Sequence, residues 1–556
     1  MTDVDGAEPQ SDAEGPPSPS IMARFSDSPI KVHHALLVGI VFIAAFTRIW
    51  RLGEPPTCYF DEVYFPTNAA LIWHGADGDA GAWNFYTTEN THPPLSKDIM
   101  ALGEGIFGNK QLASGAKNGC WPDKEDAARQ VSSDWNFDMF GARFFGAVAG
   151  IFSVIFLYLI AKRLFKNDAA ALSSAFLLAM DGLVLTQSRI ATPDAYVLCF
   201  MLGSVYYLLK RNWLLSGIFI GLSAASKWTG AFTILPVILY FGWTVFRRWR
   251  EAGSERSLRE AERVMAVGSV GVIAGVFIFG GVYLDQGELS YTPLLAGGVP
   301  AALGLFVILG GLFAILTEPK LRNLARSKVY LNAAWTFPLF FVIIPFFGVY
   351  MASYIPMFLQ GHGISYWWDL NDSAYVFHSS LKATHPSQSG ILTWPIDMRP
   401  VFFYLGSGQA KIYNLGNPLI FWMSLPALAF CTWQALRFVR IRIEPGSRLR
   451  VWGQMRTEQW TLLFVVLCYL GFWLALSTQG RALFLYHYQE ALAFAVLALG
   501  YTIGWLWQSP NPLGRYACIS FLVAVGATFI YFYPHWTAVD VSQWLDNSYY
   551  WFHSWQ

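Results

Sequence analysis

Long apolar runs alternate with short polar connections along most of this chain. A membrane-spanning helix needs roughly 20 consecutive apolar residues. Several runs are short or closely coupled, so the pattern predicts about 11–13 transmembrane helices rather than a fixed number. The runs cover residues 32–50, 138–161, 169–188, 193–209, 212–226, 229–246, 264–284, 292–316, 332–353, 416–436, 459–477, 483–507 and 514–533.

Clusters of Lys and Arg give these helices an orientation. They occur at 162–166, 210–211, 247–256, 320–328 and 437–450. Alternating the predicted helices places every cluster on the same side of the membrane, which is the cytoplasmic side by the positive-inside rule. The N-terminus is then inside, and residues 534–556 form an extracytoplasmic C-terminal tail.

Composition supports this picture. The 556 residues are 54% hydrophobic and only 13% charged, against about 25% charged in soluble domains. A net charge of +1 gives no indication of nucleic-acid binding, and no glycine-rich nucleotide-binding motif is present. Residues 1–31 are rich in Asp, Glu, Pro and Ser, which predicts a disordered cytoplasmic tail rather than a signal peptide.

The same topology leaves two long loops on the outer side, at about 51–137 and 354–415. Long irregular loops in a compact protein are usually functional. The first loop contains Cys58 and Cys120. A disulfide between them suits an oxidising compartment, and two unpaired buried thiols are the alternative.

Two adjacent carboxylates, Asp61 and Glu62, follow the first helix within an aromatic string. Apolar surroundings raise the pKa of a carboxyl group, which suits a proton acceptor in catalysis. The alternative is an acidic pair that favours the start of a helix. Further along the loop, the Pro-Pro pair after His92 holds this residue on a rigid turn, although a simple boundary between loop and helix would give the same pattern.

Ionisable residues also gather at the outer ends of several predicted helices. Arg143 is a candidate functional residue by its position inside a span, with snorkelling to the interface as the alternative. Acids and bases at one level suit a lipid phosphate and a reacting hydroxyl group; ion pairs between helices are the competing explanation. The other members are Asp181, Arg189, Asp194, Lys227, Arg481, His487 and Tyr488.

The second outer loop is rich in Trp, Tyr and Pro and includes Trp394 and Arg399, and it ends just before Asn417. It is either an amphipathic flap on the outer leaflet or a set of aromatic membrane anchors.

Together and in this order, these motifs resemble the protein O-mannosyltransferase family. Its Asp-Glu hallmark matches Phe60 to Phe65, with Tyr64 where the family commonly has His. The other matches are His92 to Lys97, the Ser188-Arg189 pair with Asp194, Lys227 to Gly230, the proline motifs from His385 to Tyr404, Leu415 to Pro418, and Arg481 to Tyr488. The resemblance covers about residues 30–500.

Two departures qualify the resemblance. No loop is long enough for the β-trefoil domain of eukaryotic members, which indicates the bacterial, actinobacterial type. After His487 and Tyr488 the family commonly continues with Leu-Pro, whereas this chain has Gln489 and Glu490.

The resemblance implies an all-α GT-C glycosyltransferase fold. It implies an enzyme that transfers mannose from polyprenyl-phosphate mannose to Ser or Thr of secreted proteins, with inversion at the anomeric carbon. Asp61 would act as general base and Glu62 would orient a substrate or pair with an arginine. The donor would be bound by Arg143, Arg189, Lys227, Arg481, His487 and Tyr488, and the acceptor and loop residues would be His92, Lys97, Asp194, Trp394, Arg399 and Asn417.

We expect no required cofactor, since the loop shows no dedicated ligand cluster beyond Asp61, Glu62 and His92, and a divalent metal is not favoured. The expected partners are the lipid donor, the secreted polypeptide, the bilayer and the secretion translocon. The expected location is the cell membrane, with the active site on the extracytoplasmic side. The alternatives are transfer of another lipid-linked sugar to a glycolipid or cell-wall glycan, and a transporter, which usually places polar residues at mid-membrane and often shows repeats.

Overall fold

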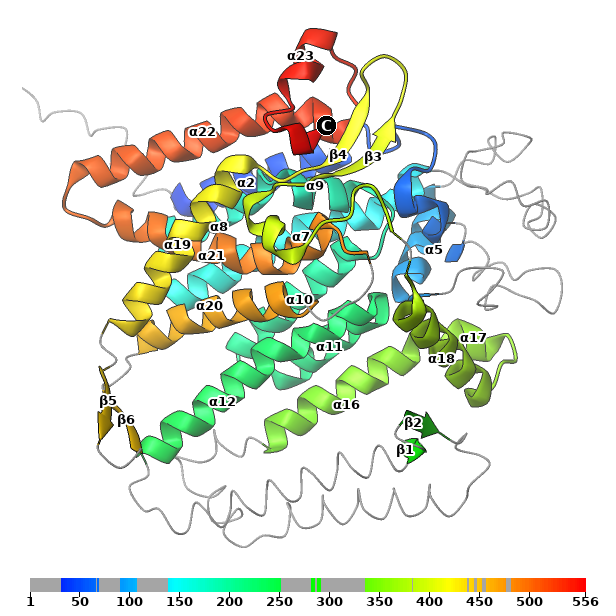
Figure 1. The fold of residues 1–556 in the computed structure, drawn as a ribbon, viewed down its shortest axis with the longest axis horizontal. Helices are drawn as coiled ribbons and strands as arrows, with labels where there is room; N and C mark the ends of the chain where they lie inside the picture. Colours follow the sequence, from blue (N-terminus) through cyan, green and yellow to red (C-terminus); the bar gives the residue numbers. More distant parts are fainter. Residues whose placement is uncertain are drawn as a thin grey trace, which may run out of the picture.

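The structure is a computed structural model. It describes residues 32–66, 68–69, 91–107, 139–251, 282–285, 288–291, 336–382, 384–437, 440–444, 448–452, 457–476 and 482–556. Over these ranges it is a bundle of apolar helices with small additions at its edges (Figure 1). The predicted tail 1–31 lies outside the described residues. So do the predicted helix at 292–316 and all but the last three residues of the one at 264–284.

Six helices are long and apolar enough to cross a membrane, judged by length and composition. They are α2 (Val32–Ile49), α7 (Met139–Phe165), α19 (Pro418–Leu436), α20 (Thr457–Leu474), α21 (Gln489–Trp507, with the turn before it) and α22 (Pro512–Thr537). Four shorter apolar helices lie among them: α10 (Asp194–Leu209), α11 (Trp213–Ser226), α12 (Ile234–Glu251) and α16 (Thr336–Ala352). All ten fall on predicted spans, which makes the chain a multi-pass membrane protein.

The predicted span at 169–188 is broken in two. Helix α8 (Asp168–Ala179) and helix α9 (Gly182–Arg189) meet at an angle of 56°. Asp181 lies at the break, where its carboxylate accepts from the backbone N–H groups of Val184 and Asn417 at 3.0 Å each. A side chain that caps a new helix N-terminus explains why the first helix stops here. Asp181 is therefore a cap and an anchor between segments, away from the cavities described below.

Helix α21 forms the centre of the bundle, because small residues let its neighbours approach closely. A Cβ on Gly500 would lie 2.0 Å from Ser174 Oγ, and one on Gly504 would lie 2.7 Å from the Ala170 side chain. Helix α8 therefore packs directly on α21. Small residues serve the same purpose in other membrane bundles, where close backbone packing takes over from the hydrophobic effect.

Helices α2 and α22 lie at the edge of the bundle (Figure 1) and keep large apolar side chains exposed. Phe42 is 67% exposed, Val523 65% and Ile530 75%. Exposed side chains of this kind suit lipid, which is as apolar as they are.

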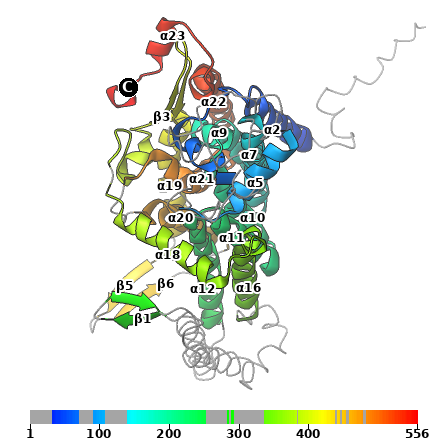
Figure 2. The same ribbon diagram turned by 90° about the vertical axis from the view of Figure 1, so that its right-hand side faces the viewer.

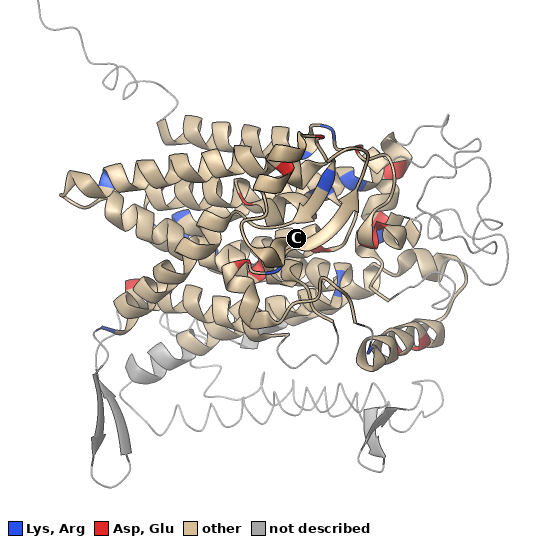
Figure 3. Ribbon diagram, turned by 45° about the horizontal axis from the view of Figure 1, so that its top comes forward, with Lys and Arg blue, Asp and Glu red and all other residues tan. Residues whose placement is uncertain are grey.

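Several helix ends beside the predicted basic loops contact one another. Arg163 at the end of α7 donates to the carbonyl of Leu209 at the end of α10, at 2.7 Å. Asn167 at the start of α8 donates to Gly504 near the end of α21, at 3.2 Å. Figure 3 shows the helices largely free of charged residues, with many of the coloured positions toward the opposite end, which the sequence predicts to be the outer one.

Short elements cover this outer end. They include the 3₁₀ turn η1 (Phe60–Val63) and helices α5 (Leu95–Phe107), α17 (Ile355–Leu359) and α18 (Ile364–Ser380). In Figure 2, which views the bundle from this end, α5 and α18 lie in front of the helix ends. The remaining turns here are η3 (Trp228–Thr233), η4 (Ile391–Ile396) and η5 (Leu485–Tyr488).

The described residues contain three antiparallel strand pairs, none of which the hydropathy pattern predicts. They are β1 (Val282–Asp285) with β2 (Glu288–Tyr291), β3 (Val401–Leu405) with β4 (Lys411–Asn414), and β5 (Arg440–Glu444) with β6 (Arg448–Trp452). In the middle pair Val401 lies opposite Asn414, with a register shift between Phe402 and Tyr404.

The C-terminal residues are folded rather than extended. Helix α23 (Gln543–Ser548) and the turn η6 (His553–Trp555) pack on the β3–β4 hairpin and on η4. Lys411 pairs with Asp546 at 2.6 Å, and Trp555 donates to the carbonyl of Asp397 at 2.8 Å. The predicted tail 534–556 thus belongs to the outer surface of the bundle.

Candidate active site

The Asp61-Glu62 pair lies in the η1 turn directly after α2. Phe60 has a φ of +51°, a conformation that costs energy for a bulky residue. Its ring stacks on Phe403 with centroids 4.4 Å apart and meets Tyr486 edge-on at 6.0 Å. These aromatic contacts hold the turn in place and explain the aromatic density of this stretch.

Glu62 is fully buried and paired with Arg143 of helix α7. Both carboxylate oxygens accept from the guanidinium at 2.7 Å, in a bidentate arrangement. One oxygen also accepts from the backbone N–H of Ala191 at 2.7 Å, and the Arg143 guanidinium lies 4.9 Å from the centre of the Tyr59 ring. A buried charge pair with added hydrogen bonds of this kind is strongly directional. It fixes the turn that carries Asp61, whose side chain is half-buried.

Arg143 has no N–H group left for a substrate phosphate in this structure. Its Nη atoms also donate to the carbonyls of Leu52, Pro55 and Thr57, at 2.8–3.2 Å. With the two bonds to Glu62 this accounts for all five donors of a guanidinium. Arg143 is expected from the sequence to bind the donor; the structure shows it positioning the Asp-Glu turn instead.

Arg189, a second residue expected to bind the donor, likewise donates hydrogen bonds to groups of the protein. It donates to the carbonyls of Thr47, Arg48, Trp50 and Arg51 at 2.8–3.1 Å, at the end of α2. A cation there satisfies carbonyl groups that the helix leaves unpaired. These hydrogen bonds of Arg189 therefore hold the segment that leads into the Asp-Glu turn.

Asp194 and Lys227 form a second ion pair at the same end of the bundle. Lys227 Nζ lies 2.9 Å from Asp194 Oδ1, and both side chains are less than 10% exposed. The ammonium also lies 5.5 Å from the centre of the Tyr486 ring. Because Tyr486 also contacts Phe60, this ion pair and the turn that carries Asp61 share one aromatic neighbour.

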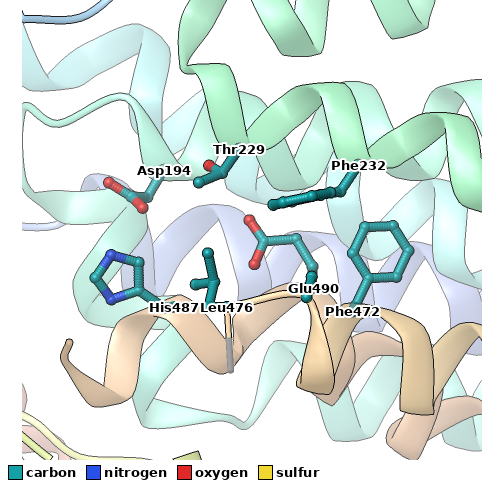
Figure 4. Close-up of a pocket in the computed structure, with 8 residues that line it drawn as sticks. Asp194, Thr229, Phe232, Phe472, Leu476, His487 and Glu490 are labelled. Carbon is teal, nitrogen blue, oxygen red and sulfur yellow. The ribbon is translucent and has the colours of Figure 1, made fainter. Parts of the chain in front are cut away.

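Two cavities meet beside this ion pair. The larger, about 160 Å³, is lined by His92, Lys227, Trp228, Thr229, Phe232, His378 and Leu476. The smaller, about 20 Å³, is lined by Asp194, Thr229, Phe232, Phe472, Ala475, Leu476, His487 and Glu490 (Figure 4). Three residues, Thr229, Phe232 and Leu476, line both cavities, so the two are adjoining parts of one site.

His92 lies at this site, as the rigid His-Pro-Pro turn predicts. Its ring stacks on Phe65 at 5.7 Å and on His378 at 5.1 Å. His378 comes from helix α18 of the second outer loop and contacts the carbonyl of Thr91 at 2.9 Å. The two outer loops therefore meet over the larger cavity.

Lys97 is 1% exposed and lies in α5 outside both cavities. Burial lowers its pKa to about 7, partly offset by the carboxylate of Asp98. Burial raises the pKa of Asp98 to about 7. Lys97 is thus part of the packing of α5 rather than of the cavity wall.

Around helix α21, His487 lines the smaller cavity, and Trp394 stacks on its ring with centroids 6.3 Å apart. Trp394 is fully buried and donates to Ser389 Oγ at 2.9 Å. Tyr488 is 1% exposed and donates to Tyr469 Oη at 3.2 Å, away from both cavities. Of these three, only His487 can reach a ligand directly.

The remaining expected residues lie apart from the cavities. Arg399 is exposed. Asn417 caps α19 and donates to the carbonyls of Met180 and Val525 at 3.1 Å, so it joins three segments. Arg481 and Cys120 lie outside the described residues. Cys58 is in a disulfide, whereas Cys199, Cys431, Cys468 and Cys518 are free, buried thiols.

Comparison with known families agrees with this arrangement. Residues 38–292 match the model of the dolichyl-phosphate-mannose-protein mannosyltransferase family, and residues 363–555 match the model of the C-terminal four-helix membrane region of protein O-mannosyltransferases. The chain belongs to the protein O-mannosyltransferase family. It is therefore a glycosyltransferase.

Curated members of the family match over nearly their whole length. The polyprenol-phosphate-mannose–protein mannosyltransferase of Mycolicibacterium smegmatis is 22% identical, covering 94% of this chain and 93% of that protein. The enzyme of the same name from Corynebacterium glutamicum is 21% identical, with the same coverage.

Among solved structures, the S. cerevisiae protein O-mannosyltransferase Pmt1-Pmt2 complex bound to the sugar donor aligns with a TM-score of 0.62 at 14% identity. The alignment covers 96% of this chain and 94% of the yeast chain. The prediction of a GT-C fold is confirmed.

Within this family fold, the structure adds residues that were not expected at the site. Glu490, Tyr486, Trp228 and His378 all contact the cavities or their ion pair. Trp228 and Tyr486 belong to motifs that match the family, and Glu490 departs from the family's pattern. The sequence could therefore have identified all three as candidate site residues. No sequence motif identifies His378 as a site residue, because only the tertiary structure brings α18 close to His92.

Among the described residues, no group of three or more His, Cys, Asp or Glu side chains is placed to hold a metal ion. The expectation that the reaction needs no metal stays a prediction.

Proposed function

We propose that this chain transfers mannose from polyprenyl-phosphate mannose to Ser or Thr hydroxyl groups of proteins. The proposal rests on one observation: a buried Glu62–Arg143 pair fixes the turn that carries Asp61, and Tyr486 contacts both Phe60 of this turn and Lys227. A general base and a cation at one membrane level suit an acceptor hydroxyl and a lipid phosphate. The names of the relatives, which state this donor and this type of acceptor, support the same proposal.

The proposed reaction is a single displacement. Asp61 takes the proton from the acceptor hydroxyl as its oxygen forms a bond to C1 of mannose. The bond between C1 and the phosphate oxygen breaks, and polyprenyl phosphate leaves as an anion. Attack from the side opposite to the leaving group inverts the anomeric carbon.

Lys227 is the described cation best placed to stabilise the departing phosphate. It lines the larger cavity, and its partner Asp194 lines the smaller one. The two imidazoles of His92 and His378 lie in the same wall of the larger cavity. The described residues that line this cavity include no carboxylate, which favours an anion there.

The remaining parts of the proposal concern the membrane side of the active site, the delivery of the acceptor, the disulfide and the need for a metal. We place the active site on the extracytoplasmic side of the cell membrane, opposite the basic loops. The acceptor would arrive as it leaves the secretion translocon. Cys58 would pair with Cys120 in that oxidising compartment. The reaction would need no metal, so EDTA should leave the rate unchanged.

The test is an assay of the purified chain with labelled polyprenyl-phosphate mannose and a Ser/Thr peptide. The wild type should form mannosyl peptide, and Asp61→Asn should slow transfer by roughly 10²–10⁴-fold, the usual loss when a general base is removed. Asp369→Asn, an exposed acid on α18, is the matched control. Label transferred to glycolipid instead of peptide would overturn the proposal, and near-normal turnover of folded Asp61→Asn would remove Asp61 from its role.

A further inference from the structure

The smaller cavity contains a carboxyl group that the proposed reaction does not use. Glu490 lies in the first turn of α21 and lines this cavity together with Asp194 and His487. Figure 4 shows its carboxyl group in the space between the other labelled side chains. Two acidic side chains therefore share one small cavity.

The contacts of the two acids differ. Asp194 is paired with Lys227 at 2.9 Å. The Glu490 carboxyl group accepts a long hydrogen bond of 3.5 Å from Gln489 Nε2 and also contacts its own backbone N–H. Gln489 itself is tied more firmly to the carbonyl of Asp194, at 2.9 Å. The start of α21 is thus fixed against Asp194, while the Glu490 carboxyl group keeps hydrogen-bonding capacity that faces the cavity.

The size of the cavity limits what can enter it. At about 20 Å³ it holds roughly one water molecule. A sugar ring does not fit, but one hydroxyl or hydroxymethyl group does. The adjoining larger cavity, about 160 Å³, can hold the rest of a sugar residue.

The side chains that line the smaller cavity further limit which chemical group can bind there. A phosphate in the smaller cavity would lie beside two acidic groups, Asp194 and Glu490, and among the described residues one ammonium, that of Lys227, is next to them, which disfavours an anion. A hydroxyl group can both donate to and accept from such groups, and Thr229 adds a further polar partner. The cation Lys227 and the imidazoles of His92 and His378 line the larger cavity, so the phosphate belongs on that side.

We propose that Glu490 forms a hydrogen bond with one hydroxyl group of the transferred sugar and so helps to select the donor. The hydroxyl group enters the smaller cavity, and the ring and phosphate lie in the larger one beside Lys227. Glu490 is then a specificity-determining residue that touches substrate. This inference rests on the proposed function, because it assumes a lipid-linked sugar donor.

The experiment combines protein variants with donors that lack single hydroxyl groups. Polyprenyl-phosphate mannose and its 2-, 3-, 4- and 6-deoxy analogues are assayed with the wild type, Glu490→Gln and Glu490→Ala. A site built to bind a hydroxyl group rejects the analogue that lacks it. We expect the wild type to lose at least about tenfold in kcat/KM with one deoxy donor, the loss of a hydrogen bond in a buried site.

The decisive readout is how the two changes combine. If Glu490 binds that hydroxyl group, the Glu490 variants should discriminate little or not at all against the same deoxy donor, while the other deoxy donors behave as with the wild type. Glu458→Gln, an exposed acid at the start of α20, is the control and should discriminate as the wild type does. Size-exclusion profiles and thermal unfolding in detergent establish that each variant is folded.

Discrimination that is the same in the wild type and both Glu490 variants, for every deoxy donor, would overturn the inference while leaving mannosyl transfer intact. Absence of transfer by the wild type from the normal donor would instead overturn the proposed function. The two failures are therefore distinguishable.

Discussion

At the scale of single residues, two neighbouring carboxylates have opposite surroundings. Glu62 is fully buried and has both oxygens in a bidentate bond to Arg143. Asp61, in the same turn, is half-buried. Glu62, fixed in its ion pair, has a structural role, whereas we propose that the more accessible Asp61 acts in catalysis. Their different environments, rather than their residue types, give them these roles.

Removing the partner of Glu62 should cost stability. Arg143→Met leaves the Glu62 charge buried without its cation, which typically destabilises a protein by about 3–5 kcal/mol. Thermal unfolding in detergent measures the effect, with Arg515→Met, an exposed arginine, as control. Adding Glu62→Gln to Arg143→Met should recover part of the loss, because it removes the uncompensated charge. An Arg143→Met variant as stable as the control would contradict the buried pair.

The Lys97-Asp98 pair should make stability depend on pH. The pKa of Asp98 is raised from 3.8 to about 7 in the folded state, so between these values the folded chain binds more protons and stability falls as pH rises. The pKa of Lys97 is lowered from 10.5 to about 7, so above pH 7 the unfolded chain binds more protons and this contribution rises with pH.

Asp98→Asn tests the acidic half of this dependence. The variant should lack the fall in stability between about pH 4 and pH 7 that Asp98 contributes. Thermal unfolding of both proteins across this range gives the comparison. Parallel curves for the wild type and the variant would show that Asp98 titrates at the same pH in both states.

At the scale of elements, close helix contacts decide where the outer loops lie. Helix α5 approaches α7 through two glycines, because a Cβ on Gly103 would lie 2.2 Å from the carbonyl oxygen of Gly141. A Cβ on Gly141 would lie 2.8 Å from the carbonyl oxygen of Gly103. The contact joins the helix that follows His92 to the helix that carries Arg143. The geometry of the site thus depends on backbone packing outside it.

One methyl group at this contact should be enough to disturb the site. Gly103→Ala must push α5 away from α7, since the obstacle is a backbone oxygen. Gly105→Ala, in the same helix, meets nothing within 4 Å and is a matched control that should be neutral or slightly stabilising. We expect Gly103→Ala to lower both thermal stability and mannosyl transfer. Equal behaviour of the two variants would show that α5 does not pack as described.

At the scale of the whole molecule, charges organise the bundle into two ends. Basic loop residues collect at one end, where α7, α8, α10 and α21 meet. Helices α5, α17 and α18 lie at the other end (Figure 1), and His378 of α18 lines the larger cavity. A glycosyltransferase whose donor is a lipid needs its site at one membrane surface rather than at the bilayer centre.

Labelling from outside intact cells tests this orientation. A membrane-impermeant maleimide should react with Ser407→Cys in the β3–β4 turn and not with Lys210→Cys at the end of α10, although both positions are exposed. The four described free thiols are buried and should give little background. Labelling of Lys210→Cys in intact cells, with Ser407→Cys protected, would place the site in the cytoplasm.

Much of this molecule follows from its sequence alone. The apolar runs predict the described helices, because hydropathy over about 20 residues is a local property. The basic clusters give a consistent orientation, and the ordered short motifs identify the family. Among the predicted site residues, His92, Asp194, Lys227 and His487 line the two cavities. The break at Asp181 and the strand pairs were not predicted, because capping and pairing depend on contacts that hydropathy does not record.

Only the tertiary structure decided which partner each charge has. Arg143 and Glu62 are 81 residues apart, and Arg189 reaches carbonyls more than 130 residues away. The sequence shows that an arginine will donate hydrogen bonds. Packing determines whether the acceptor is a substrate phosphate or a carboxylate or carbonyl group of the protein. The same holds for Glu490, whose place in a cavity depends on four segments meeting. Local hydropathy determines where the helices of this protein form, and long-range packing determines which partner each charged side chain has.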